Sequence, residues 1–361
     1  MIINIALKGK KNYAIGGYKI MFEYANRLME RGHEVNILWN YKDKFKKWPF
    51  IYNHKVIKDS IIKMFYLGKK AAWFPVDDRI KQIEFIDGLR SKDVPDADIV
   101  IATAASSVED VISLPDSKGK KCYFVQGVEN WTISKDELAQ TYRGFGLIIA
   151  ISKWIKDNIF ELSGEEAIII PNGINNEEFY VTNAPKNRSG DTIAMLYHTH
   201  EMKGSRYGIE ALNIVKAKYP NIKATIFGAS PRPSDLPKWI KYIKNANHQQ
   251  LLDIYNDSSI FLCPTINEGF GLTGAESMAC GCALVSADYQ AVHEYAVDGK
   301  NSLLCQVKNS ESLASGIEEL LLDNNKRIKL AEQGVYDIQN NLKWNNSVTL
   351  FENVLTEYCL S

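Results

Sequence analysis

Residues 260–281 read IFLCPTINEGFGLTGAESMACG. The apolar run from Ile260 to Cys263 predicts a buried strand, and a glycine-bearing turn follows it. A helix is expected to begin near Thr273. A strand, a turn and a helix in this order form the repeating unit of a parallel sheet covered by helices. The stretch therefore predicts an α/β fold.

The same alternation extends in both directions and divides into two series. Each series predicts a doubly wound, Rossmann-like sheet, with a ligand-binding cleft between the carboxyl ends of the two sheets. The expected domains are an N-terminal domain at 1–164 and a C-terminal domain at 165–344. A last helix at 345–361 is expected to pack back on the N-terminal domain. The predicted strands are 2–7, 35–39, 97–102, 122–125 and 147–151 in the first series, and 167–170, 193–197, 224–227, 260–263, 283–286 and 302–305 in the second.

Length and composition agree with a globular protein of two domains. The chain has 361 residues, of which 45% are hydrophobic and 24% charged, and 43 basic side chains balance 43 acidic ones. We expect a soluble, cytoplasmic protein because no apolar run approaches the roughly 20 residues of a membrane span and the N-terminus lacks signal-peptide features. The six cysteines are too sparse for a disulfide framework, and Cys280-x-Cys282 lacks the second pair that zinc would need, so no metal is expected.

The neutral total conceals a basic N-terminal segment. Residues 1–75 carry 15 Lys or Arg against 5 Asp or Glu, a net charge of +10. Between 42 and 74, lysines alternate with aromatic residues, which suits an anionic membrane surface at the inner face of the membrane. The alternative is a solvated face over ordinary core aromatics. Nucleic acid is not expected, since no DNA- or RNA-binding motif accompanies the charge.

Two glutamates flank the predicted helix start. Glu268 lies just before it and Glu276 about one turn inside the helix. The unpaired amides and positive dipole of a helix N-terminus favour phosphate, and carboxylates accept hydrogen bonds from hydroxyls. The pattern predicts a pocket for a diphosphate between two hydroxyl-rich groups, such as a sugar and a ribose.

This stretch resembles the E-x7-E signature of the retaining glycosyltransferases of family 4, which have the GT-B fold of two facing Rossmann-like domains. Similar resemblances run through the chain. They are the glycine turn Gly16-Gly17, the inter-domain segment Ile170-Pro171-Asn172-Gly173-Ile174, the phosphate-binding pair Lys203-Gly204 and the acidic turn His293 to Gly299.

The resemblance implies that the N-terminal domain binds the acceptor and the C-terminal domain binds the nucleotide-sugar donor. It also implies a role for each matching residue. Glu268 would hold hydroxyls of the donor sugar and stabilise an oxocarbenium-like transition state, and Glu276 would bind the ribose. Lys203 would neutralise the leaving nucleoside diphosphate. The family retains anomeric configuration without a dedicated protein nucleophile, and neither a cofactor nor a metal is implied. The implied donor-binding residues are Gly16, Gly17, Asn172, His198, Lys203, Gly269, Phe270, Gly271, Leu272, Thr273 and Glu276.

Two positions depart from the family pattern. His198 stands where the family usually has an arginine, so diphosphate binding is expected to be weaker or dependent on pH. Gln126 follows the strand at 122–125, where the family often has a histidine beside the transferred sugar. Gln126 can hydrogen-bond a sugar but cannot act as an acid or base, whereas Glu129 can, which makes Glu129 the acceptor-side candidate.

The expected activity is transfer of a hexose or deoxyhexose from a UDP, GDP or dTDP sugar to a glycan or lipid-linked glycan, in bacterial cell-surface polysaccharide assembly. The catalytic candidates are Glu268, Lys203 and Gln126. One alternative is a catalytically silent partner subunit that binds glycan or sugar nucleotide, and another is an epimerase or phosphorylase of the same fold. A dinucleotide-dependent dehydrogenase is disfavoured because no G-x-G-x-x-G turn follows the first strand.

Overall fold

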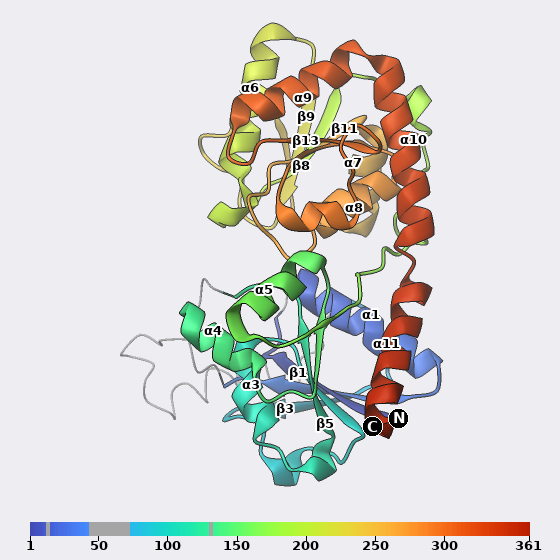
Figure 1. Ribbon diagram of the computed structural model, residues 1–361. Helices are drawn as coiled ribbons and strands as arrows, with labels where there is room; N and C mark the ends of the chain where they lie inside the picture. The colour runs from blue at the N-terminus through green and yellow to red at the C-terminus, as the bar shows by residue number, and fades with distance from the viewer. Residues whose placement is uncertain (12–14, 43–72, 130–132) are drawn as a thin grey trace. The chain divides into compact units, whose positions relative to one another are not determined.

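A computed structural model describes residues 1–11, 15–42, 73–129 and 133–361 (Figure 1). The chain divides into two compact units. Unit 1 comprises Met1–Pro171 and Ser347–Ser361, and unit 2 comprises Asn172–Asn346. The sequence placed the boundary after residue 164 and assigned 167–170 to the second sheet. The structure differs, since Ile168–Ile169 pairs with the last long strand of unit 1.

Unit 1 contains a seven-stranded parallel sheet in the order β3-β2-β1-β4-β5-β6-β7. Within the described residues, four adjacent strands of this sheet are each followed along the chain by a helix, as in the Rossmann topology. The strands are β1 (Ile2–Lys8), β2 (Glu34–Asn40), β3 (Lys81–Phe85), β4 (Ile99–Ala102), β5 (Lys120–Val125), β6 (Leu147–Ala150) and β7 (Ile168–Ile169). The helices are α1 (Gly16–Glu30), α3 (Ala105–Ile112), α4 (Lys135–Tyr142) and α5 (Lys153–Ser163), with most of α11 (Trp344–Leu360).

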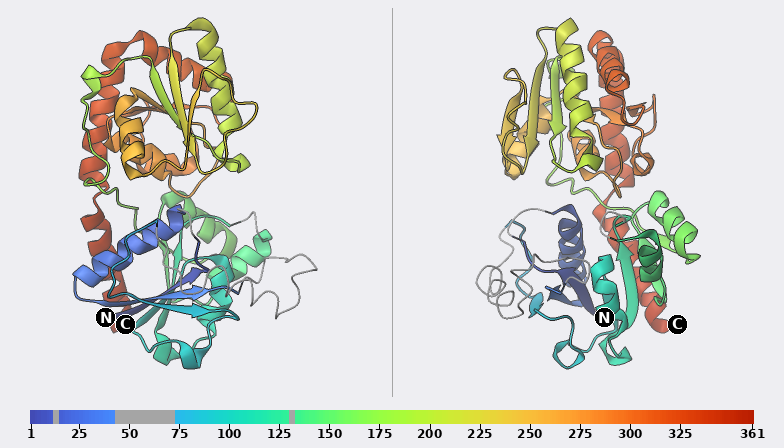
Figure 2. Two further views of the ribbon diagram at one scale, coloured as in Figure 1. Left: turned by 180° about the vertical axis from the view of Figure 1, so that it is seen from behind. Right: turned by 90° about the vertical axis from the view of Figure 1, so that its left-hand side faces the viewer.

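The C-terminal helix packs into the core of unit 1. Phe351 of α11 contacts Tyr24 of α1, with ring centroids 4.5 Å apart, and Phe124 of β5. At the rim, the Glu352 carboxylate accepts hydrogen bonds from Arg31 at 2.6 Å and pairs with His33 at 2.8 Å. Helices α1 and α11 accordingly lie side by side in both figures (Figures 1 and 2).

Unit 2 contains a six-stranded parallel sheet in the order β10-β9-β8-β11-β12-β13. Its core is formed by apolar side chains of the strands together with α6, α9 and α10. The strands are β8 (Thr192–Leu196), β9 (Lys223–Gly228), β10 (Lys241–Lys244), β11 (Ile260–Cys263), β12 (Ala283–Ala287) and β13 (Ser302–Cys305). The helices are α6 (Ser205–Lys218), α7 (His248–Asp257), α8 (Leu272–Ala279), α9 (Ser310–Leu322) and α10 (Asn324–Asn341).

Local sequence signals account for several element boundaries. Ser152 caps α5 by accepting a hydrogen bond from the Ile155 amide, as its position before the helical run predicts. Most inner strands of both sheets are nearly continuous apolar runs because parallel sheets are covered on both faces. Both fold-level predictions, an α/β class and two Rossmann-like sheets, are confirmed.

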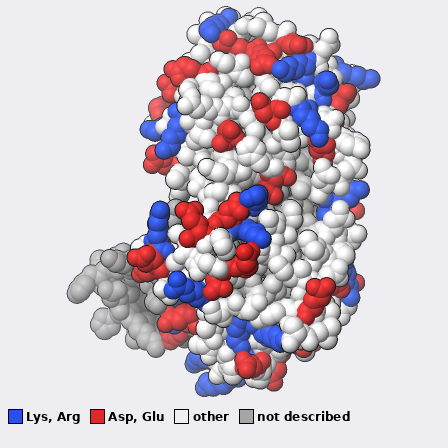
Figure 3. All heavy atoms as spheres, viewed as in Figure 1, with Lys and Arg blue, Asp and Glu red and all other residues white. Residues whose placement is uncertain are grey.

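Charged side chains of both signs are interspersed over the face shown in Figure 3. None of the helices within the described ranges combines the length and the apolar character that a bilayer crossing requires.

Candidate functional site

The predicted phosphate site of unit 2 is a loop that joins β11 to α8. The loop ends at Gly271, whose φ of +101° lies in the left-handed region that glycine adopts without strain. Gly271 is the N-cap of α8 and supplies no side-chain cap. The first amides of α8, at Leu272 and Thr273, are therefore available to an anion at the carboxyl edge of the sheet.

A second turn lies directly against this loop. It consists of the 3-10 helix η5 (Glu201–Lys203) and Gly204, which begins α6 with a φ of +63°. The Met202 carbonyl accepts a hydrogen bond from the Ile266 amide at 2.8 Å. A Cβ at Gly204 would lie 1.9 Å from the Pro264 carbonyl oxygen, so only glycine permits this approach. The packing fixes Lys203 beside the loop.

Lys203 and Glu268 form an ion pair, although they are 65 residues apart in the sequence. The side chain of Glu268 is 13% exposed and that of Lys203 31% exposed. Burial lowers the pKa of Lys203 from its ordinary value. The pair places one cation and one carboxylate at the start of α8, where the sequence predicted a diphosphate and a sugar.

His198 lies on the same turn and is exposed. Its backbone is held by Ser205, which accepts from the His198 amide and donates to the His198 carbonyl, both at 2.9 Å. The Nδ1 atom of His198 accepts a hydrogen bond from the His200 amide, which leaves the proton of the neutral ring on Nε2. Desolvation by the neighbouring protein atoms, together with the charges of Lys203 and His200, lowers the pKa of His198 from its ordinary value, so its imidazole is neutral at pH 7.

Glu276 lies in the second turn of α8 and is 7% exposed. The Tyr255 hydroxyl donates to its Oε2 atom at 3.4 Å. Tyr255 and Ser205 are contacts that the sequence did not reveal, because both come from elements remote from the E-x7-E segment. The one feature of the sequence that could have pointed to Tyr255 and Ser205 is that each places a polar group within a stretch expected to be helical.

Two candidates of unit 1, Gly17 and Gln126, contact each other. Gly17 is in the first turn of α1, immediately after Gly16, and the Gln126 side-chain amide donates to the Gly17 carbonyl at 3.2 Å. Glu129 has a structural contact: its Oε1 atom accepts a hydrogen bond from the Ala105 amide at the start of α3. Glu129 thus stabilises a helix N-terminus, whatever further role it has.

Asn172 is the first residue of unit 2 and is 1% exposed. Its Oδ1 atom is buried, and the described residues offer it no hydrogen-bond partner. Among the described residues, no hydrogen bond joins Asn172 to the loop that carries Glu268.

The described ends of the basic aromatic stretch are engaged inside unit 1. Lys42 pairs with Asp110 at 2.7 Å, and Trp73 and Phe74 pack on Phe22 of α1 with centroids 5.6 and 5.4 Å away. The side chain of Lys42 is nevertheless 42% exposed, and Trp73 and Phe74 are half-buried. The rest of the stretch, 43–72, lies outside the described residues.

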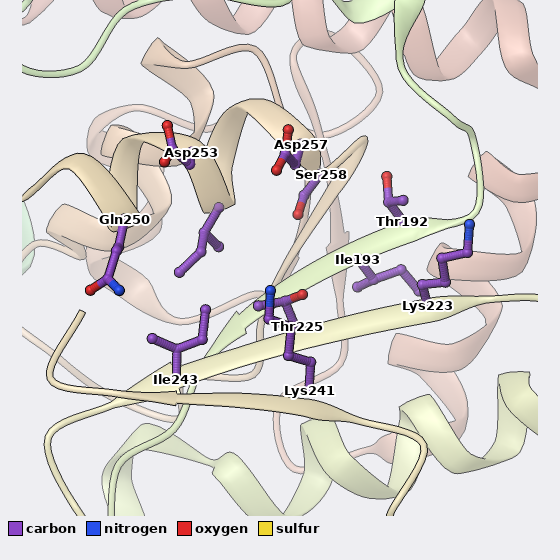
Figure 4. A pocket seen from close by; sticks show the side chains of 11 residues that line it. Thr192, Ile193, Lys223, Thr225, Lys241, Ile243, Gln250, Asp253, Asp257 and Ser258 are labelled. Carbon is purple, nitrogen blue, oxygen red and sulfur yellow. The ribbon is translucent and has the colours of Figure 1, made fainter. Parts of the chain in front are cut away.

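A cavity of about 350 Å³ lies elsewhere in unit 2, between α7 and the amino-terminal halves of β8, β9 and β10 (Figure 4). Its lining includes none of the predicted site residues. It is formed by Thr192, Ile193, Lys223, Thr225, Lys241, Ile243, Gln250, Asp253, Ile254, Asp257 and Ser258.

The two Rossmann-like units define a protein of the GT-B fold, and solved structures of that fold cover the whole chain. Sucrose-phosphate synthase from Thermosynechococcus elongatus superposes with a TM-score of 0.77 at 15% identity and covers 100% of both chains. The Anabaena protein HepE, in complex with UDP and glucose, superposes with a TM-score of 0.76 at 14% identity, over 99% of this chain and 100% of the other. At such identities the likeness concerns the fold alone.

Part of the chain matches a known protein family. Residues 177–335 match the family described as glycosyl transferases group 1. The D-inositol 3-phosphate glycosyltransferase of Corynebacterium aurimucosum is 29% identical over 118 residues, which is 33% of this chain and 28% of that protein. The chain spans 28% to 53% of the length of the first curated relatives it matches. The predicted fold is confirmed, and the match over 177–335 agrees with the predicted resemblance to glycosyltransferases.

Proposed function

We propose that this protein is a retaining glycosyltransferase that moves a hexose or deoxyhexose from a nucleotide sugar to a glycan acceptor in bacterial cell-surface polysaccharide assembly. The match of 177–335 to glycosyl transferases group 1 supports sugar transfer. The observation that carries the proposal is the Lys203–Glu268 pair beside the N-terminus of α8.

The Lys203–Glu268 pair and the N-terminus of α8 would bind different parts of the donor. The amides of Leu272 and Thr273 would hold the distal phosphate, and Lys203 would turn from Glu268 to the diphosphate as charge develops on the leaving group. Glu268 would then accept hydrogen bonds from sugar hydroxyls and stabilise positive charge on the sugar ring. Glu276 would bind the ribose.

Retention would proceed by attack of the acceptor on the face that the diphosphate leaves. A phosphate oxygen of the donor would take the acceptor proton, so the reaction requires no nucleophile from the protein. Lys203 would provide the countercharge, and we propose that no metal ion is needed for this. Gln126 of unit 1 would hydrogen-bond a sugar hydroxyl, and Glu129 is retained as the acceptor-side candidate.

The acceptor would be a glycan or a lipid-linked glycan, reached from the cytoplasmic face of the membrane. The composition of 42–74 supports the membrane part of this proposal. Flotation with liposomes that contain anionic lipid tests it, and equal recovery with neutral liposomes would remove it.

The first test is a thermal-shift panel of UDP-glucose, GDP-mannose, dTDP-rhamnose and ADP-glucose with the parent diphosphates, in EDTA. A ligand at 100 times its Kd adds about 2.7 kcal/mol, enough to raise the Tm by several degrees. A shift with one nucleotide, followed by donor hydrolysis, would support the transferase. Donor binding without any hydrolysis would instead indicate the catalytically silent partner subunit.

A further inference from the structure

Two buried tyrosines lie against the glycine-bearing turn of the candidate site. Tyr289, which follows β12, is 0% exposed, and Tyr295, at the end of the 3-10 helix η6 (Gln290–Glu294), is 6% exposed. Their hydroxyl oxygens are 2.8 Å apart, and the Tyr289 hydroxyl donates to the Phe270 carbonyl in a long hydrogen bond of 3.4 Å. One arrangement uses both protons: Tyr295 donates to Tyr289, and Tyr289 donates to Phe270.

The two hydroxyls fill a notch left by two glycines. A Cβ at Gly271 would lie 1.9 Å from the Tyr289 hydroxyl oxygen and 2.6 Å from that of Tyr295. A Cβ at Gly274 would lie 2.4 Å from the Tyr295 hydroxyl oxygen. The first turn of α8 is therefore shaped to receive the tyrosine pair, and a side chain at either glycine would displace it.

The same contact reaches Glu268. The Cβ position of Gly271 is also 3.2 Å from the Glu268 Oε1 atom, so the carboxylate and the two hydroxyls lie around the same point beside Gly271. The ring of Phe270 also packs on Tyr295, with centroids 5.7 Å apart.

The tyrosine pair is itself anchored in unit 2. The Asn301 side-chain amide donates to the Tyr295 carbonyl at 3.1 Å and to the Asp337 carboxylate of α10 at 2.8 Å. Asn301 is 2% exposed, so these bonds form in the interior, where an unpaired polar group is costly. A continuous series of hydrogen bonds and backbone contacts therefore connects α10, through Asn301 and the two tyrosines, to the turn that carries Glu268.

We propose that Tyr289 and Tyr295 are positioning residues of the donor site. Their paired hydroxyls fix the Phe270 carbonyl and the first turn of α8, and thereby orient Glu268 and the amides proposed to face the distal phosphate. The part of this inference that concerns catalysis rests on the proposed function. Its structural part, the support of the turn, does not.

The structural part is tested without ligand, by hydrogen exchange of residues 270–275 in Tyr289→Phe. The matched control is Tyr242→Phe, which also removes a hydroxyl that donates to a backbone carbonyl, that of Ser230 at 2.7 Å, near the edge strand β10. We expect exchange of these amides to rise about tenfold in Tyr289→Phe and to stay unchanged in the control. Equal exchange in the two variants would overturn the inference.

The catalytic part is tested by turnover of the sugar nucleotide that gives the largest thermal shift in the panel above. Tyr289→Phe should lower kcat about tenfold, while affinity for the matching nucleoside monophosphate stays within about twofold, because Glu276 rests on Tyr255 and not on the pair. A parallel loss of monophosphate affinity, or kcat equal to that of Tyr242→Phe, would contradict the positioning role.

A double-mutant cycle measures the coupling between Gly274 and the Tyr295 hydroxyl. Gly274→Ala alone should lower kcat, and the loss should be smaller when Tyr295→Phe has removed the hydroxyl that the new methyl group meets. If the effects of the two substitutions on kcat were strictly additive, the proposed contact between Gly274 and the Tyr295 hydroxyl would be wrong. If the wild-type protein turns over no donor at all, the proposed function fails, and the exchange experiment still decides whether the pair supports the turn.

Discussion

Separating Lys203 from Glu268 should affect binding and catalysis differently. In Lys203→Met the diphosphate loses one charge-assisted contact, which contributes about 1.5–3 kcal/mol, so the Kd for nucleoside diphosphate should rise about 10- to 100-fold. The Glu268 carboxylate, 13% exposed, is then left beside the phosphates and adds repulsion. In Glu268→Gln the lysine is released toward the diphosphate, so binding should stay equal or tighten while transfer is abolished.

The same substitutions should change the free energy of unfolding less than they change ligand binding. Removing one partner of a fully buried pair costs about 3–5 kcal/mol, but Lys203 is 31% exposed, which reduces the expected loss to about 1–2 kcal/mol. Isothermal titration with UDP and GDP measures the binding, release of nucleoside diphosphate measures turnover, and thermal unfolding confirms that each variant folds. An equal loss of diphosphate affinity in both single variants would refute the division of roles.

Three other substitutions test single features of the site. His198→Arg should tighten diphosphate binding about tenfold at pH 7.5, because the wild-type imidazole, with its lowered pKa, is neutral there; titration checks this, and an equal gain with monophosphate would count against it. Because burial lowers the pKa of Lys203, this lysine loses its charge at a lower pH than an exposed lysine does. A titration of diphosphate affinity against pH should therefore show a fall at a lower alkaline pH than an exposed lysine would give, and Lys203→Arg should not show this fall. Gly204→Ala should destabilise the protein by more than about 2 kcal/mol in urea unfolding, through left-handed strain and the clash with the Pro264 carbonyl, whereas Gly164→Ala, which meets nothing within 4 Å, should cost only about 1 kcal/mol.

The prediction from the sequence missed one strand in each sheet, and the two missed strands occupy the same position at the edge of their sheets. β3 and β10 were not predicted, and each is the outer strand beside the second strand of its sheet. An outer strand can be short and polar, as the sequence Lys-Tyr-Ile-Lys of β10 is, so a search for apolar runs passes over it. The short run at 167–170 was predicted correctly as a strand but assigned to the wrong sheet, since periodicity does not specify a partner.

The sequence by itself determined that the chain forms two α/β units, where most of their strands lie, and that Glu268, Lys203 and the start of α8 carry the family resemblance. These follow from local patterns, because strand and helix periodicity and glycine turns are read within short windows. Only the tertiary structure decided that Lys203 pairs with Glu268 and that Tyr289 and Tyr295 fill the notch at Gly271 and Gly274. Contacts of this kind join residues far apart in the chain, and the parallel sheet that brings their loops to one edge is a property of the folded protein, not of any segment.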